Sequence, residues 1–393
     1  MRFIDLKTQF FLAEERIRAR MDAVLAHGQF ILGPEVAELE NQLRAMTGAK
    51  YCLTCASGSS ALDLIMLAWK FGPGDAVFTS PFTFAATAES IARTGATPIF
   101  VDIDPVSFNI DASQLERAVN AVLSGDPTQY PLPAVAQKHK LRPRAVVTVD
   151  IFGHPADYDA IFKTAEKYGM QILEDAAQSL GGKYRGKPLC GCGCDAAAAS
   201  FFPTKPLGCY GDGGAVFTDN EDTAALVDSL RYHGRRDARH KYDNVRLGMN
   251  SRLDTLQAAV LLAKLEKFPD ELRARQQLAD RYRDLLAVVP DLTAPSNPRH
   301  GESVWAQYTV MLPENTDRAA LIAAMKDKDI PAMIHYPKSL HLQEAFSFLG
   351  YAPEDFPAVQ NATARVLSLP MHPYLEAAEQ NRVVECLKRF FDA

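Results

Sequence analysis

Short β-like runs alternate with helical runs over the first two-thirds of this chain, and no other feature of the sequence constrains the fold as much. Turn residues separate the runs: Gly72, Pro73, Gly74 and Asp75 lie between a helical run at 61–70 and a β-like run at 76–79. Such alternation is typical of βαβ units, whose strands form a mostly parallel sheet sandwiched by helices. We therefore predict an α/β fold, with further strands at 51–54, 98–101, 145–150, 171–174, 196–202 and 214–218 and further helices at 85–93 and 158–168.

The pattern changes after Arg252, where two long helical runs follow each other without a β-like run between them. These helices are expected at 256–268 and 272–288. A smaller α+β region comes next, with strands expected at 307–311 and 332–335 and helices near 318–328 and 377–391.

This change in pattern predicts two domains in a chain of 393 residues. The large domain is expected at 1–250, beginning with an N-terminal segment at 1–15, and the small C-terminal domain at 251–393. Within the large domain, residues 121–143 carry a glycine and four prolines and predict a surface insertion.

Charge and composition exclude several classes of protein. The formal net charge is −6, so a sequence-independent grip on nucleic acid is not expected. The N-terminus carries too many charged residues for a signal peptide. The most apolar stretch, 64–69, is far shorter than the roughly 20 residues that cross a bilayer. Seven cysteines, an odd number, indicate free thiols in a reducing cytoplasm. We therefore expect a cytoplasmic protein without nucleic-acid or membrane partners.

Lys205 is the first candidate for chemistry, because it lies between two prolines and precedes the glycine-rich run 208–214. A lysine on such a stiffened turn can be presented to a planar ligand, and a partly desolvated amine can form an imine with a carbonyl cofactor. The alternative is an ordinary solvated surface lysine.

Asp175 is the second candidate, since it ends the predicted strand at 171–174, and ligands of open parallel sheets collect at the carboxyl ends of strands. A carboxylate there can keep the ring nitrogen of pyridoxal phosphate (PLP) protonated. The alternative is a helix N-cap.

Two weaker signals also follow predicted strands. Residues 56–60, Ala-Ser-Gly-Ser-Ser, precede a helix and could bind a phosphate at its N-terminus, although a simple helix cap is the alternative. Phe84 could stack on a ring or pack in the core.

Taken in order, these segments resemble the DegT/DnrJ/EryC1/StrS family of PLP-dependent sugar-nucleotide aminotransferases, which have the aspartate aminotransferase fold (fold type I). The resemblance runs nearly end to end, from Phe3-Ile-Asp-Leu to Ser368-Leu-Pro-Met-His372. Its most specific part is the run from Lys205 to Gly214.

The resemblance implies roles for individual residues. Lys205 would form the imine and then shuttle a proton, Asp175 would pair with the pyridine nitrogen, and Gln178 would bond the ring hydroxyl. Phe84 and Ala177 would contact the two faces of the cofactor ring. The phosphate would be bound by Ser59, Ser60, Ser200 and the neighbouring subunit's Asn250. The sugar side of the pocket would be lined by Arg252, Tyr308 and His335.

The resemblance also implies the reaction. L-glutamate would donate an amino group to a nucleotide-linked keto-sugar, a UDP-linked 2-acetamido-3-oxo sugar of the glucuronate type, for lipopolysaccharide or other surface polysaccharide. The site would be shared across a homodimer. The alternative is a non-catalytic PLP-binding sensory or regulatory protein on the same scaffold.

Two further features stay outside this interpretation. The basic run 231–241 could meet a diphosphate or a sugar carboxylate, or form a solvated loop. Cys190, Cys192 and Cys194 suggest zinc, but structural zinc sites usually space cysteines two to four residues apart. We therefore predict no metal, and a hairpin at 181–187 before a cysteine-containing loop.

Overall fold

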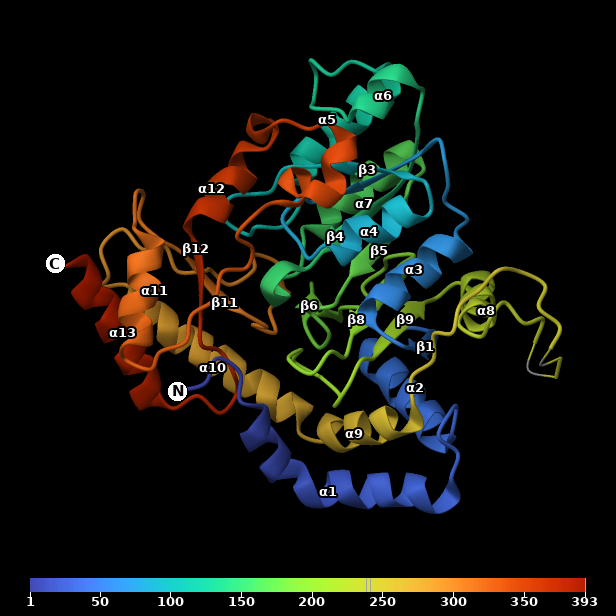
Figure 1. Cartoon of the computed structure of the whole chain (residues 1–393), viewed down its shortest axis with the longest axis horizontal. Helices are drawn as coiled ribbons and strands as arrows, with labels where there is room; N and C mark the ends of the chain where they lie inside the picture. The colour runs from blue at the N-terminus through green and yellow to red at the C-terminus, as the bar shows by residue number, and fades with distance from the viewer. Residues whose placement is uncertain (238, 241, 393) are drawn as a thin grey trace.

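Figure 1 shows the chain in a computed structural model, which describes residues 1–237, 239–240 and 242–392. A large sheet lies between helices, and α10 leads away from it to a smaller part that holds the C-terminus. Within the described residues, the large sheet has seven strands in the order β1-β9-β8-β5-β4-β2-β3. Their bounds are Tyr51–Cys55 (β1), Asp75–Thr79 (β2), Thr97–Phe100 (β3), Arg142–Val149 (β4), Gln171–Asp175 (β5), Ala196–Ser200 (β8) and Gly214–Thr218 (β9).

The strand directions confirm a mostly parallel sheet, with β9 as the exception. Strands β3, β2, β4, β5 and β8 are parallel, whereas β9 is antiparallel to β8 and to β1. A parallel connection needs a crossover of about a dozen residues or more, usually with a helix. The segment between Ser200 and Gly214 forms no helix, and the chain returns along β8 in the opposite direction. This returning segment carries Lys205.

Alternating side chains of each strand face the two helical layers. In β8, Ala196 and Ala198 pack with α3 and α8, whereas Ala197 and Ala199 pack with α2 and α9. Helices α5 and α7 cover the second face farther along the sheet. The helices of this part are Leu6–His27 (α1), Pro34–Thr47 (α2), Gly58–Ala68 (α3), Ala86–Arg93 (α4), Ala112–Ser124 (α5), Ala134–Lys138 (α6), Tyr158–Tyr168 (α7), Glu221–Leu230 (α8) and Thr255–Leu265 (α9).

The N-terminus of the chain packs against the smaller, C-terminal part of the molecule. Helix α1 includes most of residues 1–15 and continues to His27, lying alongside α9 (Figure 1). Met1 packs against the core of the smaller part. The N-terminal segment expected at 1–15 is therefore the start of a longer helix.

The stretch 121–143, expected as a surface insertion, is partly core. It begins inside α5, contains α6, and ends in the first residues of β4. Tyr130 and Leu132 are buried, and the Tyr130 hydroxyl accepts a hydrogen bond from the backbone N–H of Asp102 at 2.8 Å. The prolines set the turns of this stretch, but its apolar side chains still fill space beside the sheet.

The hairpin expected at 181–187 is present. Strands β6 (Lys183–Tyr184) and β7 (Lys187–Pro188) are antiparallel, and β10 (Gly301–Glu302) pairs with β6.

The smaller part has a two-stranded antiparallel sheet of β11 (Tyr308–Met311) and β12 (Val366–Leu369). The strand expected at 332–335 is wrong, since only an isolated bridge from Met333 to Ser368 forms there. Pro331 lacks a backbone donor, and β12, which sequence analysis missed, is the strand that pairs with β11. The helices are Phe268–Leu286 (α10), Arg318–Lys326 (α11), Pro357–Arg365 (α12) and Ala377–Phe391 (α13).

The division into domains 1–250 and 251–393 remains a prediction. Helix α9 packs on the large sheet through Ala258 and Leu261, whereas the core of the smaller part begins in α10 with Ala279. This packing favours a boundary inside α10.

Candidate active site

Lys205 lies on the turn that connects β8 to β9, at the carboxyl end of β8. Backbone hydrogen bonds close this turn, from Lys205 N to the Phe202 carbonyl (2.8 Å) and from Cys209 N to the Phe201 carbonyl (2.8 Å). Burial lowers the pKa of Lys205, while the nearby Asp175 carboxyl raises it. Among the described residues, none forms a hydrogen bond or a salt bridge with Nζ of Lys205. A desolvated amine without a partner is available as a nucleophile and as a base.

Asp175 ends β5 and is buried, with its carboxyl group held by two donors. Thr87 Oγ1 of α4 donates to Oδ2 at 2.7 Å, and Ala177 N donates to Oδ1 at 3.2 Å. Burial raises the pKa of Asp175, and these donors together with Lys205 lower it. A carboxylate can accept about four hydrogen bonds, so acceptor capacity remains. Sequence analysis missed Thr87, whose side chain depends on the packing of α4.

Gln178 is fixed by contacts from two distant segments. Its Oε1 accepts from the backbone N–H of Phe152 at 2.7 Å, and its Nε2 donates to the Tyr336 hydroxyl at 3.3 Å. Burial raises the pKa of Tyr336, and the Asp175 carboxyl raises it further, so this phenol stays protonated at neutral pH. Sequence analysis missed Tyr336 as a site residue, although it follows His335 in the chain.

His335 lies close to the same group. Its Nδ1 is 2.9 Å from Ser368 Oγ of β12, and burial, with a smaller effect of Lys205, lowers the pKa of His335 to about 4. The imidazole is therefore neutral at physiological pH and can donate or accept a hydrogen bond. The structure thus brings Lys205, Asp175, Gln178 and His335 together, as predicted for one site.

The small residues at 56–60 form the start of α3 and lie against β8. Ser57 caps the helix, because its side chain accepts a hydrogen bond from Ser60 N at 3.0 Å. Gly58 approaches Ser200 so closely that an added Cβ would lie 2.7 Å from Ser200 Cβ. Ser59, Ser60 and Ser200 therefore surround a helix N-terminus, where backbone N–H groups and the helix dipole favour an anion.

Phe84 lies just before α4, where its carbonyl accepts from the backbone N–H of Thr87, and Ala177 follows Asp175 two residues later. The Phe84 ring is 61% exposed, which a core phenylalanine is not, so its face is free to stack on a planar ligand. Ala177 is half-buried beside Asp175.

Asn250 and Arg252 lie together beside Tyr232. Arg252 Nη2 donates to Asn250 Oδ1, and its guanidinium is 4.7 Å from the centre of the Tyr232 ring. Asn250 is exposed, and the next residue, Ser251, accepts a hydrogen bond from Ala56 N at 3.3 Å. Asn250 and Arg252 therefore lie beside the start of α3, on the side of the candidate active site where the phosphate is expected.

Tyr308 does not line a pocket, contrary to the prediction that it lines the sugar side. It is fully buried in the core of the smaller part, between Tyr282 (5.0 Å between ring centres) and Trp305 (5.6 Å). Its position in β11 turns the ring inward, because alternate residues of an edge strand face the core.

The basic run 231–241 is partly a structural element. Arg231 is buried and binds Glu40 Oε1 (2.8 Å), Asp228 Oδ1 (2.7 Å) and the Thr54 carbonyl (2.6 Å). Ala238 and Lys241 of this run lie outside the described residues.

Comparison with known proteins identifies the family. The sequence profile of the DegT/DnrJ/EryC1/StrS aminotransferase family matches residues 12–388. UDP-2-acetamido-2-deoxy-3-oxo-D-glucuronate aminotransferase from Pseudomonas aeruginosa is 43% identical over 376 residues, covering 96% of each chain. This chain belongs to the DegT/DnrJ/EryC1/StrS aminotransferase family.

Solved structures agree with this assignment. A DegT DnrJ EryC1 StrS aminotransferase from Brucella abortus is 43% identical and superposes with a TM-score of 0.90 over 100% of both chains. NtdA from Bacillus subtilis, solved with the cofactor PMP bound, is 27% identical, with a TM-score of 0.86 over 97% of this chain and 82% of that one. The predicted fold and the predicted activity are confirmed: this is a PLP-dependent aminotransferase of sugar nucleotides.

The residues of the aminotransferase fit PLP in three respects. Lys205 offers a free, desolvated amine, and Asp175 keeps acceptor capacity for a ring N–H. Gly58 contacts Ser200 so closely that the Ser200 hydroxyl lies beside the N-terminus of α3, where both can donate to a phosphate. The site thus offers groups for the ring of the cofactor, Lys205 and Asp175, and for its phosphate, at Gly58 and Ser200.

We expect Gly58→Ala to weaken PLP binding. The added methyl group would push the first turn of α3 away from Ser200, and overpacking of this kind costs about 1–3 kcal/mol. The Kd of PLP should rise about tenfold or more, since each 1.4 kcal/mol is roughly a factor of ten. Titration of the apoenzyme with PLP measures this change. Gly72→Ala is the control, because its Cβ would meet only the Thr94 carbonyl at 3.9 Å; equal affinities for the two variants would contradict the prediction.

Lys264 of α9 supports the turn that carries Lys205. Its Nζ donates to the Gly208 carbonyl at 2.5 Å and lies 4.4 Å from the centre of the Tyr210 ring. Burial lowers the pKa of Lys264 to about 8, against an opposing effect of Glu271.

We expect Lys264 to make the free energy of unfolding rise with pH above about 8. The unfolded lysine keeps its proton up to about 10.5, so between these two pH values the unfolded state binds more protons and folding gains stability as the pH rises. The gain is on the order of 3 kcal/mol for a shift of this size. Urea unfolding of wild type and Lys264→Met across this range measures it. The difference between the two proteins should change with pH, and a constant difference would show that Lys264 does not titrate there.

Proposed function

We propose that this aminotransferase moves the amino group of L-glutamate to carbon 3 of a UDP-linked 2-acetamido-3-oxo sugar that carries a carboxylate. The desolvated amine of Lys205 beside Asp175 is the observation that carries the transamination. The substrate class is supported by the 43% identity, over 96% of both chains, with a relative named for UDP-2-acetamido-2-deoxy-3-oxo-D-glucuronate.

PLP, when bound, supplies a carbonyl group and a ring that accepts electrons. The chain's residues do the rest. Nζ of Lys205 takes the proton from Cα of glutamate and later returns a proton to carbon 3 of the sugar. The Asp175 carboxylate keeps the pyridine nitrogen protonated, and Gln178 donates a hydrogen bond to the hydroxyl oxygen of the cofactor ring. Ser59, Ser60 and Ser200 bind the phosphate.

The surroundings of these groups shift both pKa values. Burial raises the pKa of Asp175, and the donors Thr87 and Ala177, which hold its carboxyl group, oppose this shift and so favour the anion. Burial lowers the pKa of Lys205, which favours the neutral amine that a base requires. His335 is neutral and lies near Lys205, and its proposed role is a hydrogen bond to the sugar.

Incubation with L-glutamate and candidate keto-sugars tests the substrate. We expect a UDP-linked 3-amino sugar acid and 2-oxoglutarate, identified by mass spectrometry, with the sugar acid preferred in kcat/KM over the matched UDP-sugar that has a hydroxymethyl group in place of the carboxylate. A preference for the uncharged sugar would contradict the assignment of the sugar acid. Failure with every keto-sugar, while glutamate still converts the cofactor, would contradict the assignment of the acceptor class.

The non-catalytic alternative is weaker. A protein that only senses PLP needs no reactive amine, whereas Lys205 keeps its desolvated position beside Asp175. Conversion of the bound cofactor by L-glutamate separates the two functions.

We also propose a homodimer in which Asn250 of one chain completes the phosphate site of the other. Exposed large apolar side chains, two of them adjacent in α1, support a dimer: Phe11 (58% exposed), Leu12 (62%) and Leu247 (95%). Asn250 is itself exposed, so its side chain is accessible to a second chain.

Mixing two inactive variants tests this sharing. A dimer of one Lys205→Ala chain and one Asn250→Ala chain has one intact site if Asn250 serves the partner, and no intact site if it serves its own chain. We expect mixing to restore about a quarter of the wild-type rate, since random exchange makes half of the dimers mixed. No recovery, with mixed dimers shown by native mass spectrometry, would place Asn250 in its own site.

We place the protein in the cytoplasm, in the synthesis of lipopolysaccharide or another surface polysaccharide. The seven cysteines support a reducing compartment, since all are free. Within the described residues, none of the helices has the length and apolarity that a membrane crossing requires.

A further inference from the structure

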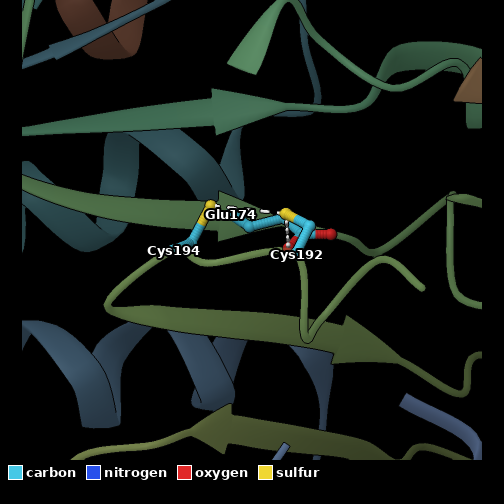
Figure 2. A group of neighbouring side chains, drawn as sticks. All are labelled: Glu174, Cys192 and Cys194. Carbon is cyan, nitrogen blue, oxygen red and sulfur yellow. Dashed lines mark hydrogen bonds between the residues drawn. The ribbon is translucent and has the colours of Figure 1, made fainter. Parts of the chain in front are cut away.

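Glu174, Cys192 and Cys194 form a compact group on the face of the sheet opposite to Asp175. Glu174 precedes Asp175 in β5, and adjacent residues of a strand point to opposite faces. The two cysteines lie in the loop between β7 and β8, and the three side chains point toward one another (Figure 2). One ligand atom from each, two Sγ and a carboxylate oxygen, all lie within 4.8 Å of one another.

The distances in this group match the edges of a metal-centred tetrahedron. Cys192 Sγ is 3.8 Å from Cys194 Sγ and 3.7 Å from Glu174 Oε2. With Zn–S of about 2.3 Å and Zn–O of about 2.0–2.2 Å, tetrahedral angles give separations of roughly 3.8 Å between two sulfurs and roughly 3.6 Å between sulfur and oxygen. Two of the three edges therefore fit a zinc ion, and the third pair, Cys194 Sγ and a Glu174 oxygen, lies within 4.8 Å.

Gly193 makes the short spacing of the cysteines possible. Its φ is +120°, a conformation that side-chain-bearing residues avoid, and it brings the two flanking sulfurs to the same side. The one-residue gap, which argued against zinc from the sequence, is thus no obstacle in the folded loop.

The group also lacks a positive partner. Glu174 is fully buried, and the described lysine and arginine residues form no salt bridge with it. Its oxygens accept hydrogen bonds from Cys190 N (2.9 and 3.0 Å) and from Cys192 Sγ (3.7 Å). Its carboxyl group also forms a side-chain hydrogen bond with the buried Asp150 carboxyl, so two acidic groups lie together here. A buried carboxylate is costly without a cation or a full set of donors, and a divalent metal supplies the missing charge.

We propose that Cys192, Cys194 and Glu174 bind a zinc ion in a structural site. The two thiols release their protons to solvent, so two thiolates and one carboxylate surround the ion. The half-buried side of Cys194 leaves the fourth position open to water. The ion ties the loop between β7 and β8 to β5, next to the strand end that positions Asp175.

Zinc counting on tag-free holoenzyme tests this proposal. The protein is incubated with zinc, desalted and measured by inductively coupled plasma mass spectrometry. We expect one zinc per chain in wild type and almost none in the double variant Cys192→Ser, Cys194→Ser. Cys386→Ser is the matched control, because Cys386 is also buried with a sulfur hydrogen bond (3.9 Å to the Ala324 carbonyl) but lies in the smaller part, and it should keep the full zinc content.

A second measurement on wild type alone guards against a variant that fails to fold. X-ray absorption at the zinc edge should show two sulfur neighbours at about 2.3 Å. Zinc that is absent from wild type, zinc without sulfur neighbours, or equal zinc in the folded double variant would each overturn the proposal. So would a disulfide between Cys192 and Cys194 in the freshly purified protein, seen as a mass lower by two hydrogens.

Discussion

Lys205→Ala abolishes transamination, with an expected loss in kcat on the order of 10⁴-fold or more. General acid–base catalysis by one side chain contributes about 10²–10⁴-fold, and this lysine is also the proposed nucleophile toward the cofactor, so both contributions are lost together. Single-turnover reaction of the PLP-loaded variant with L-glutamate, followed by visible absorption, measures the loss.

The fold should survive this substitution. Among the described residues, none bonds to Nζ of Lys205, and removal of a buried amine relieves a desolvation cost, so the Tm of the apoenzyme should stay the same or rise. Lys187→Ala is the control, because Lys187 is an exposed lysine of the β6–β7 hairpin and should keep wild-type kcat. A Lys205→Ala protein that is folded, binds PLP and still turns over within tenfold of wild type would exclude the proposed role.

Asp175→Asn should lower kcat by about 10²–10³-fold. The asparagine has the same shape and can still accept from Thr87, but it carries no charge to hold a proton on the ring nitrogen. Loss of a buried charge opposite a cation costs about 3–5 kcal/mol, and the lower half of that range corresponds to this factor. Steady-state kinetics at saturating PLP measures kcat, and the absorption of the bound cofactor reports the change at the ring.

Asp102→Asn is the matched control for Asp175→Asn. Asp102 is also a buried aspartate just after a strand, but its oxygens accept from the backbone N–H groups of Ile103, Ala358 and Val359. We expect Asp102→Asn to lower the Tm while leaving the kcat of the folded enzyme near wild type. In contrast, Asp175→Asn should leave the apoenzyme at least as stable as wild type, because burial already raises the pKa of Asp175 and penalises its charge. If Asp175→Asn unfolds the protein and leaves kcat intact, Asp175 is structural.

Local features of the chain were sufficient for the fold class, whereas the chemistry came from the resemblance of its motifs, taken in order, to a known family. The alternation of β-like and helical runs predicted the sheet because helices and strands have different hydrophobic periods, which can be counted along the sequence. Lys205 and Asp175 could be picked out because Lys205 lies in a turn rich in proline and glycine and Asp175 lies at the end of a predicted strand.

The tertiary structure decided which side chains surround these groups. Thr87 reaches Asp175 from 88 positions away, and Tyr336 reaches Gln178 from 158 positions away. Tyr308 was expected at the sugar and lies in a core, since the face that an edge strand buries depends on the partner strand, β12, which sequence analysis missed. The group of Glu174, Cys192 and Cys194 likewise exists only because the loop folds over β5. The local sequence shows the hydrophobic period of each helix or strand, the turns between them and the reactive side chains. Contacts between distant segments depend instead on how whole elements pack, and only the folded chain contains that information.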